Sequence, residues 1–347
     1  MNIISIIIPC RNEEEHIQFC LQSVLNFRIP EDTQIEILIV DGMSNDQTVT
    51  MIKNIMNHEP RVSLLKNLKL TQAVAMNLAL SKAKGSWIMR LDAHSIYPRD
   101  YLMLCLETAE RTGADNVGGV IITKEGDNSY QASIVQAIST HKFGVGNSGF
   151  RTGAKEGPAD TVPFGFFKTE VFKRVGVFNE KLIRAQDFEF NARIRRAGGK
   201  IWLNPNIHCY YYNQKSLFNF YRKQILLDAP YNAYMWYLAP YTFTIRHAIT
   251  ALFSFGFISG TVLSLISPVF NWLFISIMVL YFFLALFSSV QQAIRYKNIK
   301  HVFILPFCFF LYHFIHGLGL LKGIVLLIFN KAPVQKGSEP WPGAGKF

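Results

Sequence analysis

Asp92 and His94 are the residues whose types and spacing offer the clearest chemistry in this sequence. They follow the segment Trp87 to Leu91, which is predicted to be a strand, and they stand two positions apart in RLDAHSIYP. A carboxylate and an imidazole at one strand end can both reach a divalent cation, which can bridge the phosphates of a bound nucleotide. The pair therefore predicts a metal site, although the isolated tripeptide DxH is more often an ordinary surface turn.

A second group of carboxylates lies in the segment LIRAQDFEFNARIRRAGGKIW. Asp187 and Glu189 are the candidates there for a general base, the group that removes a proton from an attacking hydroxyl. Arg193 follows Glu189 by four residues, so the two side chains can pair across one helical turn. Taken alone, this segment also has the pattern of a charged amphipathic helix, and spacing does not decide between the two interpretations.

Three predicted strands bring candidate residues to one edge of a sheet. The run Ile3 to Ile8 ends at Pro9, and the run Ile35 to Val40 ends at Asp41, with a helical pattern over 13–27 between them. This alternation indicates a parallel sheet, and ligands of such α/β sheets bind at the carboxyl ends of the strands. The alternation continues with a helix over 46–57, a strand over 62–65, a helix over 71–84 and the strand before Asp92.

Two common phosphate-binding loops are absent from the sequence. The turn after the first predicted strand reads PCRNEEE, without the glycines of GxGxxG, and no GxxxxGK[ST] loop occurs. These absences exclude the usual dinucleotide-binding and P-loop sites. They leave the metal predicted at Asp92 and His94 as the group that handles the phosphates.

The composition divides the chain into a soluble part and a membrane part. Of the 347 residues, 50% are hydrophobic and 17% are charged, and the apolar excess is concentrated in 249–329. We expect a catalytic α/β domain over 1–225, an interfacial aromatic-rich helical segment over 226–248, transmembrane or re-entrant helices over 249–329 and a tail over 330–347. Buried core helices are the alternative interpretation for the apolar stretches and for the aromatic segment.

Three apolar stretches, 249–267, 269–289 and 302–329, reach membrane-spanning length. The first two meet at Pro268 as in a hairpin, and basic residues at both hairpin ends place those ends on the cytoplasmic side. Pro306, two histidines and two glycines interrupt the third stretch, so we expect a broken, re-entrant segment there. The protein is therefore expected to be a multi-pass protein of the inner (plasma) membrane, with its catalytic domain in the cytoplasm.

The formal net charge of +11 does not indicate a nucleic-acid partner. Lys and Arg are scattered through the soluble part without a recognition motif, and attraction to anionic lipid headgroups accounts for the excess. The five cysteines form an odd set without CxxC spacing, which indicates a reducing compartment. Membrane lipids are therefore expected partners, and nucleic acids are not.

Four segments stand in the order and spacing of family 2 glycosyltransferases: ISIIIPCRNEEEHI, ILIVDGMSNDQT, AVAMNLALSKAKGSW and IMRLDAH. The chain resembles this family over roughly residues 3–225. Within it, RLDAHSIYPRDY and the motif YHFIHGLG of the membrane part resemble the bacterial exopolysaccharide branch of succinoglycan ExoA type. The resemblance implies the GT-A fold of nucleotide-diphospho-sugar transferases, a mostly parallel sheet flanked by helices, followed by a C-terminal helical membrane domain.

The resemblance also implies roles for individual residues. Asp41 would hold the uracil or ribose of the donor, and turn capping is the alternative use of this residue. Asp92 and His94 stand where most of the family has DxD, and the imidazole favours Mn²⁺ over Mg²⁺ as the divalent cation. Asp187 would be the catalytic base, in a motif where Gln186 replaces the usual Glu. The nucleotide pocket would be lined by Pro9, Arg11, Asn12 and Glu13.

Downstream, the segment FNFYRKQ stands where the processive synthases of the family carry QxxRW. The absence of that motif implies a single addition per encounter rather than polymerisation. Arg222 and Gln224 are expected to approach the diphosphate or the acceptor, and Glu189 and Arg193 are expected to play supporting roles.

The expected function is inverting transfer of a sugar from a nucleotide sugar, expected to be a UDP-sugar, to a polyprenyl-linked saccharide during synthesis of exopolysaccharide or another cell-surface glycan. A membrane anchor close after the Asp187 region favours such a lipid-linked acceptor. Three alternatives stay open: transfer to bare polyprenyl phosphate, a non-catalytic membrane scaffold, and a nucleotidyltransferase. A non-catalytic scaffold would be expected to have lost catalytic residues, whereas Asp41, Asp92 and Asp187 are all present. A nucleotidyltransferase would be expected to have a Gly-rich, basic N-terminal loop, which this sequence lacks.

Overall fold

The structure, a computed structural model, describes residues 2–334 of the chain. Within this part the chain forms two compact units. The first unit contains residues 2–122 and 153–212, and the second contains residues 123–152 and 213–334. The chain therefore passes between the two units three times within the described residues.

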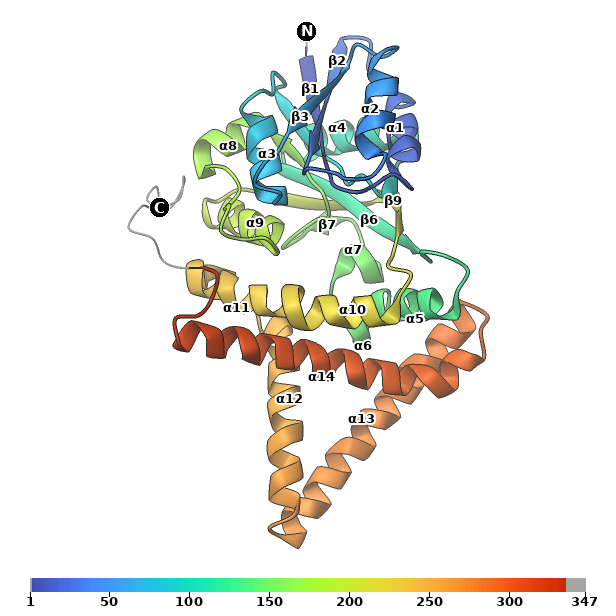
Figure 1. Cartoon of the computed structure of the whole chain (residues 1–347), viewed down its shortest axis with the longest axis vertical. Coiled ribbons are helices and arrows are strands. Elements are labelled where there is room, and N and C mark those ends of the chain that lie inside the picture. The colour runs from blue at the N-terminus through green and yellow to red at the C-terminus, as the bar shows by residue number, and fades with distance from the viewer. Residues whose placement is uncertain (1, 335–347) are drawn as a thin grey trace. The chain divides into compact units, whose positions relative to one another are not determined.

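A mixed sheet forms the centre of the first unit (Figure 1). Its strands lie in the order β3-β2-β1-β4-β8-β6-β9-β5, and β7 pairs with β9. The N-terminal half of this sheet is parallel. On β1, the side chains of Ile4, Ile6 and Ile7 are all fully buried, as expected for a parallel strand that is covered on both faces. The parallel strands are β1 (Asn2–Cys10), β2 (Thr33–Asp41), β3 (Val62–Lys66) and β4 (Trp87–Arg90).

Helices connect these parallel strands, so the predicted alternation of strands and helices is confirmed. Each observed element lies within a few residues of its predicted range, and the strands that end near Pro9, Asp41 and Asp92 are neighbours in the sheet. The connecting helices are α1 (Ile17–Leu25), α2 (Thr48–Met56) and α3 (Gln72–Leu80).

The other half of the sheet is antiparallel. The short strand β8 pairs with both β4 and β6, while β5 and β7 pair with β9. Stacked rings of Trp87 and Phe166, with centroids 4.7 Å apart, join the two halves. The elements of this half are β5 (Ser95–Ile96), α4 (Tyr101–Thr112), β6 (Asn116–Lys124), β7 (Gly157–Pro158), β8 (Phe166–Lys168), α8 (Thr169–Val175), α9 (Gln186–Arg196) and β9 (Ile201–Tyr212).

The second unit is helical, and its core joins segments that lie far apart in the sequence. Ile134 and Ile138 of α5 pack with Phe220 of α10 and with Leu305 and Phe309 of α14. The shorter elements of this unit are α5 (Tyr130–Ser139), α6 (Lys142–Val145), α7 (Gly149–Thr152), α10 (Leu217–Lys223), the π-helical turn η1 (Gln224–Asp228), α11 (Ala229–Leu238) and the 3₁₀ turn η2 (Pro240–Thr242).

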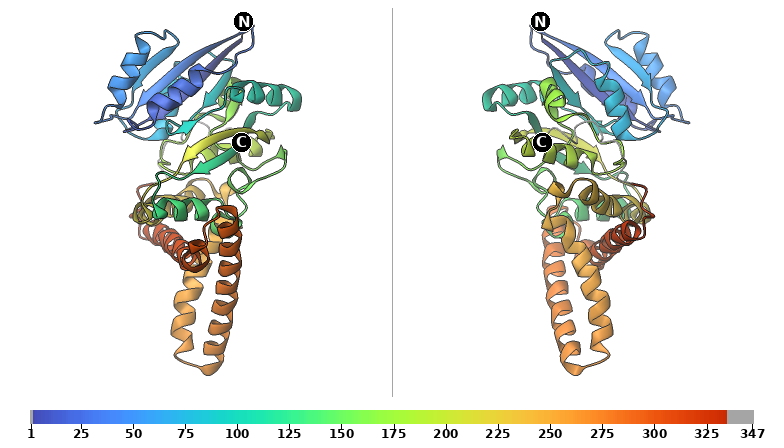
Figure 2. Two further views of the ribbon diagram at one scale, coloured as in Figure 1. Left: turned by 90° about the vertical axis from the view of Figure 1, so that its right-hand side faces the viewer. Right: turned by 90° about the vertical axis from the view of Figure 1, so that its left-hand side faces the viewer.

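Two long helices, α12 (Ile245–Ser264) and α13 (Pro268–Arg295), form a hairpin (Figure 2). The sequence has no Asp, Glu, Lys or Arg between Arg246 and Arg295, and large apolar side chains such as Leu252 and Trp272 are exposed on the hairpin. Helices α12, α13 and α14 are each long and apolar enough to cross a membrane. The predicted hairpin of apolar helices is therefore present in the structure.

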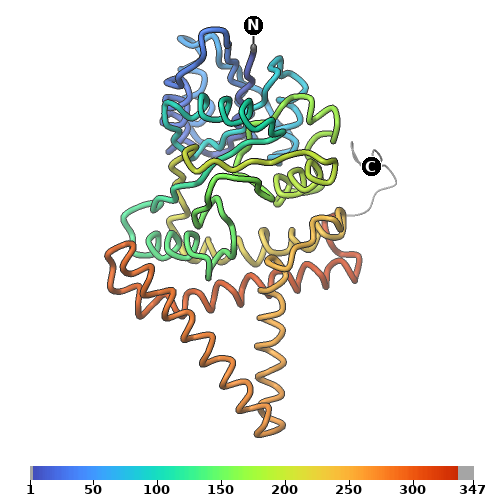
Figure 3. The backbone as a smooth tube through the Cα atoms, turned by 180° about the vertical axis from the view of Figure 1, so that it is seen from behind, coloured from blue at the N-terminus to red at the C-terminus, as the bar shows by residue number. Residues whose placement is uncertain are grey.

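The third apolar stretch forms one continuous helix, α14 (Lys300–Ile328), so the prediction of a broken segment is wrong. Within the second unit, α14 runs across the hairpin instead of alongside it (Figures 1 and 3). Its glycines serve close packing: a Cβ on Gly317 would lie 2.0 Å from the Thr250 carbonyl oxygen of α12, and one on Gly323 would lie 2.9 Å from Pro230 Cα of α11. Glycine in this helix permits contact between backbones and does not break the helix.

The aromatic-rich segment before the hairpin contains the helix α11, and its place at a membrane interface stays a prediction. The rings of Tyr231 and Tyr234 are buried within the second unit, which agrees with the core alternative for these two residues. Trp236 packs edge to face against Phe243, with ring centroids 5.0 Å apart, and Tyr237 is 36% exposed. The segment therefore combines core rings with rings at the surface of the unit.

Candidate active site

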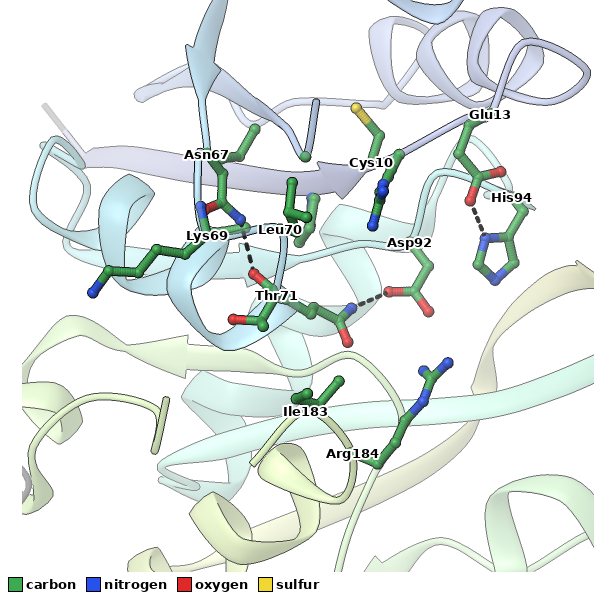
Figure 4. A pocket seen from close by; sticks show the side chains of 16 residues that line it. Cys10, Glu13, Asn67, Lys69, Leu70, Thr71, Asp92, His94, Ile183 and Arg184 are labelled. Atoms are coloured by element: carbon green, nitrogen blue, oxygen red, sulfur yellow. Dashed lines mark hydrogen bonds and ion pairs between the residues drawn. The ribbon is translucent and has the colours of Figure 1, made fainter. Parts of the chain in front are cut away.

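A pocket of about 580 Å³ lies in the first unit at the carboxyl ends of β1, β2 and β4 (Figure 4). This is the position that the strand order predicts for a ligand site, and the volume suits a small-molecule ligand. The side chains of Asp92 and His94 both line it, so the structure brings the two predicted metal ligands to one cavity. The other polar lining residues are Arg11, Glu13, Asn67, Lys69, Thr71, Gln72 and Arg184.

Hydrogen bonds hold the Asp92 carboxylate in a fixed orientation. Its Oδ1 accepts from Arg90 Nη2 at 2.9 Å and from Gln72 Nε2 at 3.3 Å. The backbone of Asp92 is also held, because its N–H donates to the Tyr97 hydroxyl, and that hydroxyl donates to the Asp92 carbonyl. Arg90 of β4 and Gln72 of α3 therefore set the direction of the Asp92 carboxylate, while Tyr97 holds its backbone.

His94 is bound to a carboxylate of the first loop. Glu13 Oε1 lies 2.9 Å from His94 Nδ1 (Figure 4). The Tyr211 ring packs against the imidazole in an edge-to-face arrangement, with centroids 4.9 Å apart. A carboxylate on one ring nitrogen is the arrangement that orients metal-binding histidines through the other nitrogen. Glu13, expected to line the nucleotide pocket, therefore also sets the orientation of His94.

The donor set suits a divalent cation that is shared with a substrate. Within residues 2–334, no three His, Cys, Asp or Glu side chains are grouped so that they could hold a metal ion by themselves. Asp92 and His94 offer one oxygen ligand and one nitrogen ligand on the same pocket wall. Cations bound through one or two side chains complete their coordination with substrate phosphates and water, so these residues fit such a cation.

The buried guanidinium of Arg90 joins Asp92 to Asp187. Its Nη2 contacts Asp92 Oδ1 at 2.9 Å, and its Nη1 contacts Asp187 Oδ2 at 3.4 Å. Burial lowers the pKa of Arg90, but the charges of Asp92 and Asp187 outweigh this effect and raise the pKa above its ordinary value. Arg90 therefore remains a cation and fixes the candidate metal ligand and the candidate base relative to each other.

Asp187 lies at the start of α9 and does not line the pocket directly. Its side chain is 42% exposed, so it remains open to a second substrate. Gln186 beside it donates to Gln72 Oε1 at 2.7 Å, and Gln72 in turn donates to Asp92. A second chain of hydrogen bonds thus connects the start of α9 to the end of β4.

Glu189 and Arg193 form the ion pair that their spacing predicted. The guanidinium donates to both carboxylate oxygens, at 3.1 and 2.8 Å, and to the carbonyl oxygens of Val175 and Val177. Both side chains are fully or almost fully buried, at 0% and 1% exposure, so neither of them is available to contact a substrate. The pair fixes α9 against the loop that follows α8.

The loops after β1 and β2 are bonded to each other. Asp41 is buried and accepts from the Ser44 hydroxyl at 2.6 Å and from the Ser44 N–H, which is the turn-capping use of aspartate. Asn12, with its backbone in the left-handed region at φ 54°, receives the Asn45 N–H. Pro9 and Arg11 line the pocket, whereas Asn12 and Asp41 shape the loops around it.

Cys10 also lines the pocket, but its thiol is not a candidate nucleophile. Burial, followed by the charges of Asp41, Glu13 and Asp46, raises the pKa of Cys10 far above its ordinary value. The thiolate is the reactive form of cysteine, so this residue is inert at neutral pH.

Three lining residues were not singled out by the sequence. Lys69 and Arg184 bring positive charge to the pocket, and Figure 4 shows the Arg184 side chain directed toward Asp92. Gln72 connects Asp92 to Gln186. None of the three belongs to a recognisable short motif, and their contribution depends on the folding of distant segments onto one cavity.

Arg222 and Gln224 belong to the second unit. Gln224 is buried and donates to Asp228 Oδ2 at 3.0 Å, while Arg222 is exposed on α10. Their approach to the diphosphate or the acceptor stays a prediction.

Comparison with known proteins agrees with this fold. The profile of the family described as "Glycosyl transferase family 2" matches residues 5–176. A dolichyl N-acetyl-glucosaminyl phosphate diacetamido-dideoxy-glucuronosyltransferase of Methanococcus voltae is 32% identical over 337 residues, which cover 94% of this chain and 98% of that protein. The succinoglycan biosynthesis protein ExoA of Rhizobium meliloti is 33% identical over 214 residues, which cover 61% of this chain and 64% of that protein.

Among solved structures, the mannosyltransferase PcManGT of Pyrobaculum calidifontis, in complex with GDP-Man and Mn²⁺, is similar with a TM-score of 0.57. The identity is 18%, and the match covers 94% of this chain and 87% of that chain, so this similarity establishes the GT-A fold. The family profile, the relative that is similar over nearly its full length and the shared fold agree with one another. The chain therefore belongs to glycosyltransferase family 2 and is a glycosyltransferase.

Proposed function

We propose that this protein transfers a sugar, with inversion, from a nucleoside diphosphate sugar to a saccharide that a phosphate group links to a polyprenyl lipid. The donor we propose is a UDP-sugar, and the product is a lipid-linked precursor of a cell-surface glycan. The observation that carries this proposal is the contact of one guanidinium, that of Arg90, with both Asp92 and Asp187. It ties a candidate ligand for the phosphate-bound cation to a candidate base beside the pocket.

The reaction we propose is a single displacement. The acceptor hydroxyl oxygen bonds to the anomeric carbon of the donor, and the bond from that carbon to the diphosphate oxygen breaks with its electron pair on the leaving group. Asp187, which lies in the first turn of α9, takes the hydroxyl proton. Asp92 and His94 would hold a divalent cation, which when bound would neutralise charge on the diphosphate.

The positive side chains around the pocket support a diphosphate ligand. Arg11, Lys69 and Arg184 line the same cavity as Asp92. Their charges favour binding of an anionic donor to a pocket that also contains carboxylates. The Mn²⁺ and GDP-Man bound by the mannosyltransferase with this fold agree with the same chemistry.

Two observations support a lipid-linked acceptor. The relative from Methanococcus voltae is named for transfer to a dolichyl N-acetyl-glucosaminyl phosphate. In this chain, the first unit is joined to the second by three chain passages within the described residues, and the second unit contains the apolar hairpin. A catalytic unit confined to a bilayer meets a lipid-bound acceptor at high effective concentration, which it would not do for a soluble sugar.

We further propose that the hairpin crosses the inner membrane and that its open end faces the cytoplasm. Arg246 lies at the start of α12, while Arg295 and Lys297 lie at the end of α13, and positive residues favour the cytoplasmic side. With α12 about 30 Å long, the hairpin matches the hydrocarbon thickness of a bilayer. Helix α14, which runs across the hairpin, would then lie along the membrane surface.

Labelling of lipids tests the acceptor class. Purified enzyme in lipid nanodiscs, supplied with radiolabelled UDP-sugars and Mn²⁺, is expected to label a lipid extract only when a polyprenyl-linked saccharide is present. Bare polyprenyl phosphate and the free oligosaccharide are the two control acceptors. Equal labelling of bare polyprenyl phosphate, or efficient transfer to the free oligosaccharide, would show that the proposed acceptor is wrong.

Substitutions of Arg90 are expected to change both the stability and the activity of the protein, by different amounts. Replacing Arg90 by Leu removes the buried cation that contacts both carboxylates, so the free energy of unfolding should fall by about 3 kcal/mol. Loss of a residue that orients a metal ligand should also lower kcat/KM by about 10- to 100-fold. Arg90→Lys keeps the charge but not the fork that contacts both carboxylates, so it should recover stability more fully than activity.

Thermal melting and steady-state kinetics measure these two effects. The matched control is Arg174→Leu, which removes an exposed guanidinium that pairs with Asp115 at 2.8 Å away from the pocket. Such exposed pairs contribute only about 0–1 kcal/mol, so this control should remain close to wild type. Wild-type kcat/KM in Arg90→Leu would contradict the proposed role of Arg90.

A further inference from the structure

An apolar groove runs between the two hairpin helices of the second unit, and the proposed transfer chemistry does not use it. Its volume is about 310 Å³, and all of its lining residues are apolar or glycine. Helix α12 contributes one wall and α13 the other. The residues that matter for its shape are Leu252, Phe253, Gly256, Phe257, Gly260 and Phe274.

The two glycines of the groove stand four residues apart in GFISG, a spacing that often marks a helix-packing face. They differ in surroundings. A Cβ on Gly260 would lie 2.6 Å from Phe274 of α13, so this glycine is covered by its own chain. A Cβ on Gly256 would meet nothing within 4 Å, so this glycine opens the groove. Because Phe274 already occupies half of the GxxxG face, a second helix cannot pack closely against both glycines.

The groove has a positive residue above it on the same helix face. Arg246, Phe253 and Gly260 are each seven residues apart, which is nearly two full turns, so all three lie on one side of α12. Arg246 stands in the first turn, where its guanidinium contacts the Asn147 carbonyl oxygen at 3.5 Å. Between it and the groove, Ile249 is 59% exposed. The positive charge of Arg246 and the apolar surface that follows it on α12 match a lipid with an anionic headgroup.

We infer that this groove binds the isoprenoid chain of the acceptor lipid, with the lipid phosphate at the level of Arg246. This inference rests on the proposed function and adds to it the place where the lipid carrier is recognised. The groove has room for hydrocarbon chain at the open Gly256, while the arginine supplies charge complementarity to a phosphate at the headgroup layer. The enzyme would therefore select its lipid carrier by the isoprenoid chain as well as by the saccharide.

Filling the groove tests the inference. Full-length protein in nanodiscs is assayed with one saccharide joined through the same phosphate linkage to a long polyisoprenyl chain or to a two-isoprene citronellyl chain. Gly256→Leu places a side chain in the open part of the groove, so KM for the long-chain acceptor should rise by about tenfold. KM for the citronellyl acceptor should stay unchanged. Thr261→Leu, at an exposed position of the same helix outside the groove, is the matched control and should behave as wild type.

The outcomes separate the inference from the proposed function. If the wild type transfers to no polyprenyl-linked saccharide, the proposed function fails and the inference fails with it. If the wild type transfers well, two results for Gly256→Leu overturn only the inference. One is an equal loss of transfer to the long-chain and citronellyl acceptors, and the other is no loss of transfer to either acceptor. A disulfide between Gly256→Cys residues of two copies that persists when any lipid acceptor is added would also overturn the inference. It would assign the groove to a second copy of the chain.

Discussion

Asp187→Asn is expected to bind the donor as the wild type does and to turn over about 100- to 10,000-fold more slowly, the range that general-base catalysis contributes. The amide is close in size to the carboxylate but cannot take a proton from the acceptor hydroxyl. Asp187 does not line the donor pocket, so loss of its charge should leave the donor site intact. The measurements are kcat at saturating substrates and the dissociation constant of the donor by titration calorimetry.

Asp100→Asn is the matched control for that experiment. Asp100 is an exposed carboxylate at the start of α4, and it contacts Arg28 at 4.0 Å outside the pocket. The same chemical change there should leave kcat unchanged. Turnover at the wild-type rate in Asp187→Asn would move the base to another residue, while loss of donor affinity equal to the loss of turnover would assign Asp187 to binding.

Removal of divalent cations is expected to abolish turnover, and addition of Mn²⁺ is expected to restore it. The leaving diphosphate develops negative charge that a bound cation neutralises, an effect that contributes several kcal/mol to the transition state. Because one of the two proposed ligands is an imidazole, Mn²⁺ should support faster turnover than Mg²⁺, which prefers oxygen ligands. Activity after EDTA treatment, with and without each added metal, measures this.

Asp92→Ala tests the proposed metal ligand directly. This variant should lose turnover and should not recover at Mn²⁺ concentrations that restore the EDTA-treated wild type. Binding of Mn²⁺ in the presence of UDP, followed by electron paramagnetic resonance, should weaken in Asp92→Ala and provides a readout independent of activity. Undiminished turnover in metal-free buffer would contradict the assignment of Asp92 and His94.

The parallel half of the sheet could be predicted from the sequence because each strand is a short apolar run that ends in a polar residue. Short β-branched runs such as Ile3 to Ile8 favour a buried strand, and the helical patterns between them indicate parallel pairing. The convergence of Pro9, Asp41 and Asp92 at one edge then follows from topology alone. The antiparallel half has short strands such as β8, with three residues, which carry too little pattern to be recognised.

The links between site residues could not be predicted, because each joins segments far apart in the chain. Glu13 and His94 are 81 positions apart, Arg90 and Asp187 are 97 apart, and Gln72 and Gln186 are 114 apart. Spacing carries no information about such contacts. By contrast, the pair Glu189 and Arg193 was predictable because four residues of helix fix its geometry.

The glycines of the last apolar segment show how one residue type supports opposite predictions. In the sequence, Gly317 and Gly319 indicate a break, because glycine is a poor helix former in water. In the structure, the missing side chains let α12 and η1 approach the backbone of α14. A single sequence does not contain the neighbour that decides between the two outcomes.

The most direct test of the account is release of nucleoside diphosphate and formation of the glycoside in the same reaction. Purified full-length protein in nanodiscs, with Mn²⁺ and a polyprenyl-linked saccharide, is incubated with a panel of nucleotide sugars. Products are identified by mass spectrometry, and the anomeric configuration of the new bond is determined by NMR. We predict equal amounts of UDP and of an acceptor extended by one sugar with inverted anomeric configuration. Retention of configuration, or no nucleoside diphosphate release from any donor while the fold and Mn²⁺ binding are intact, would contradict the account.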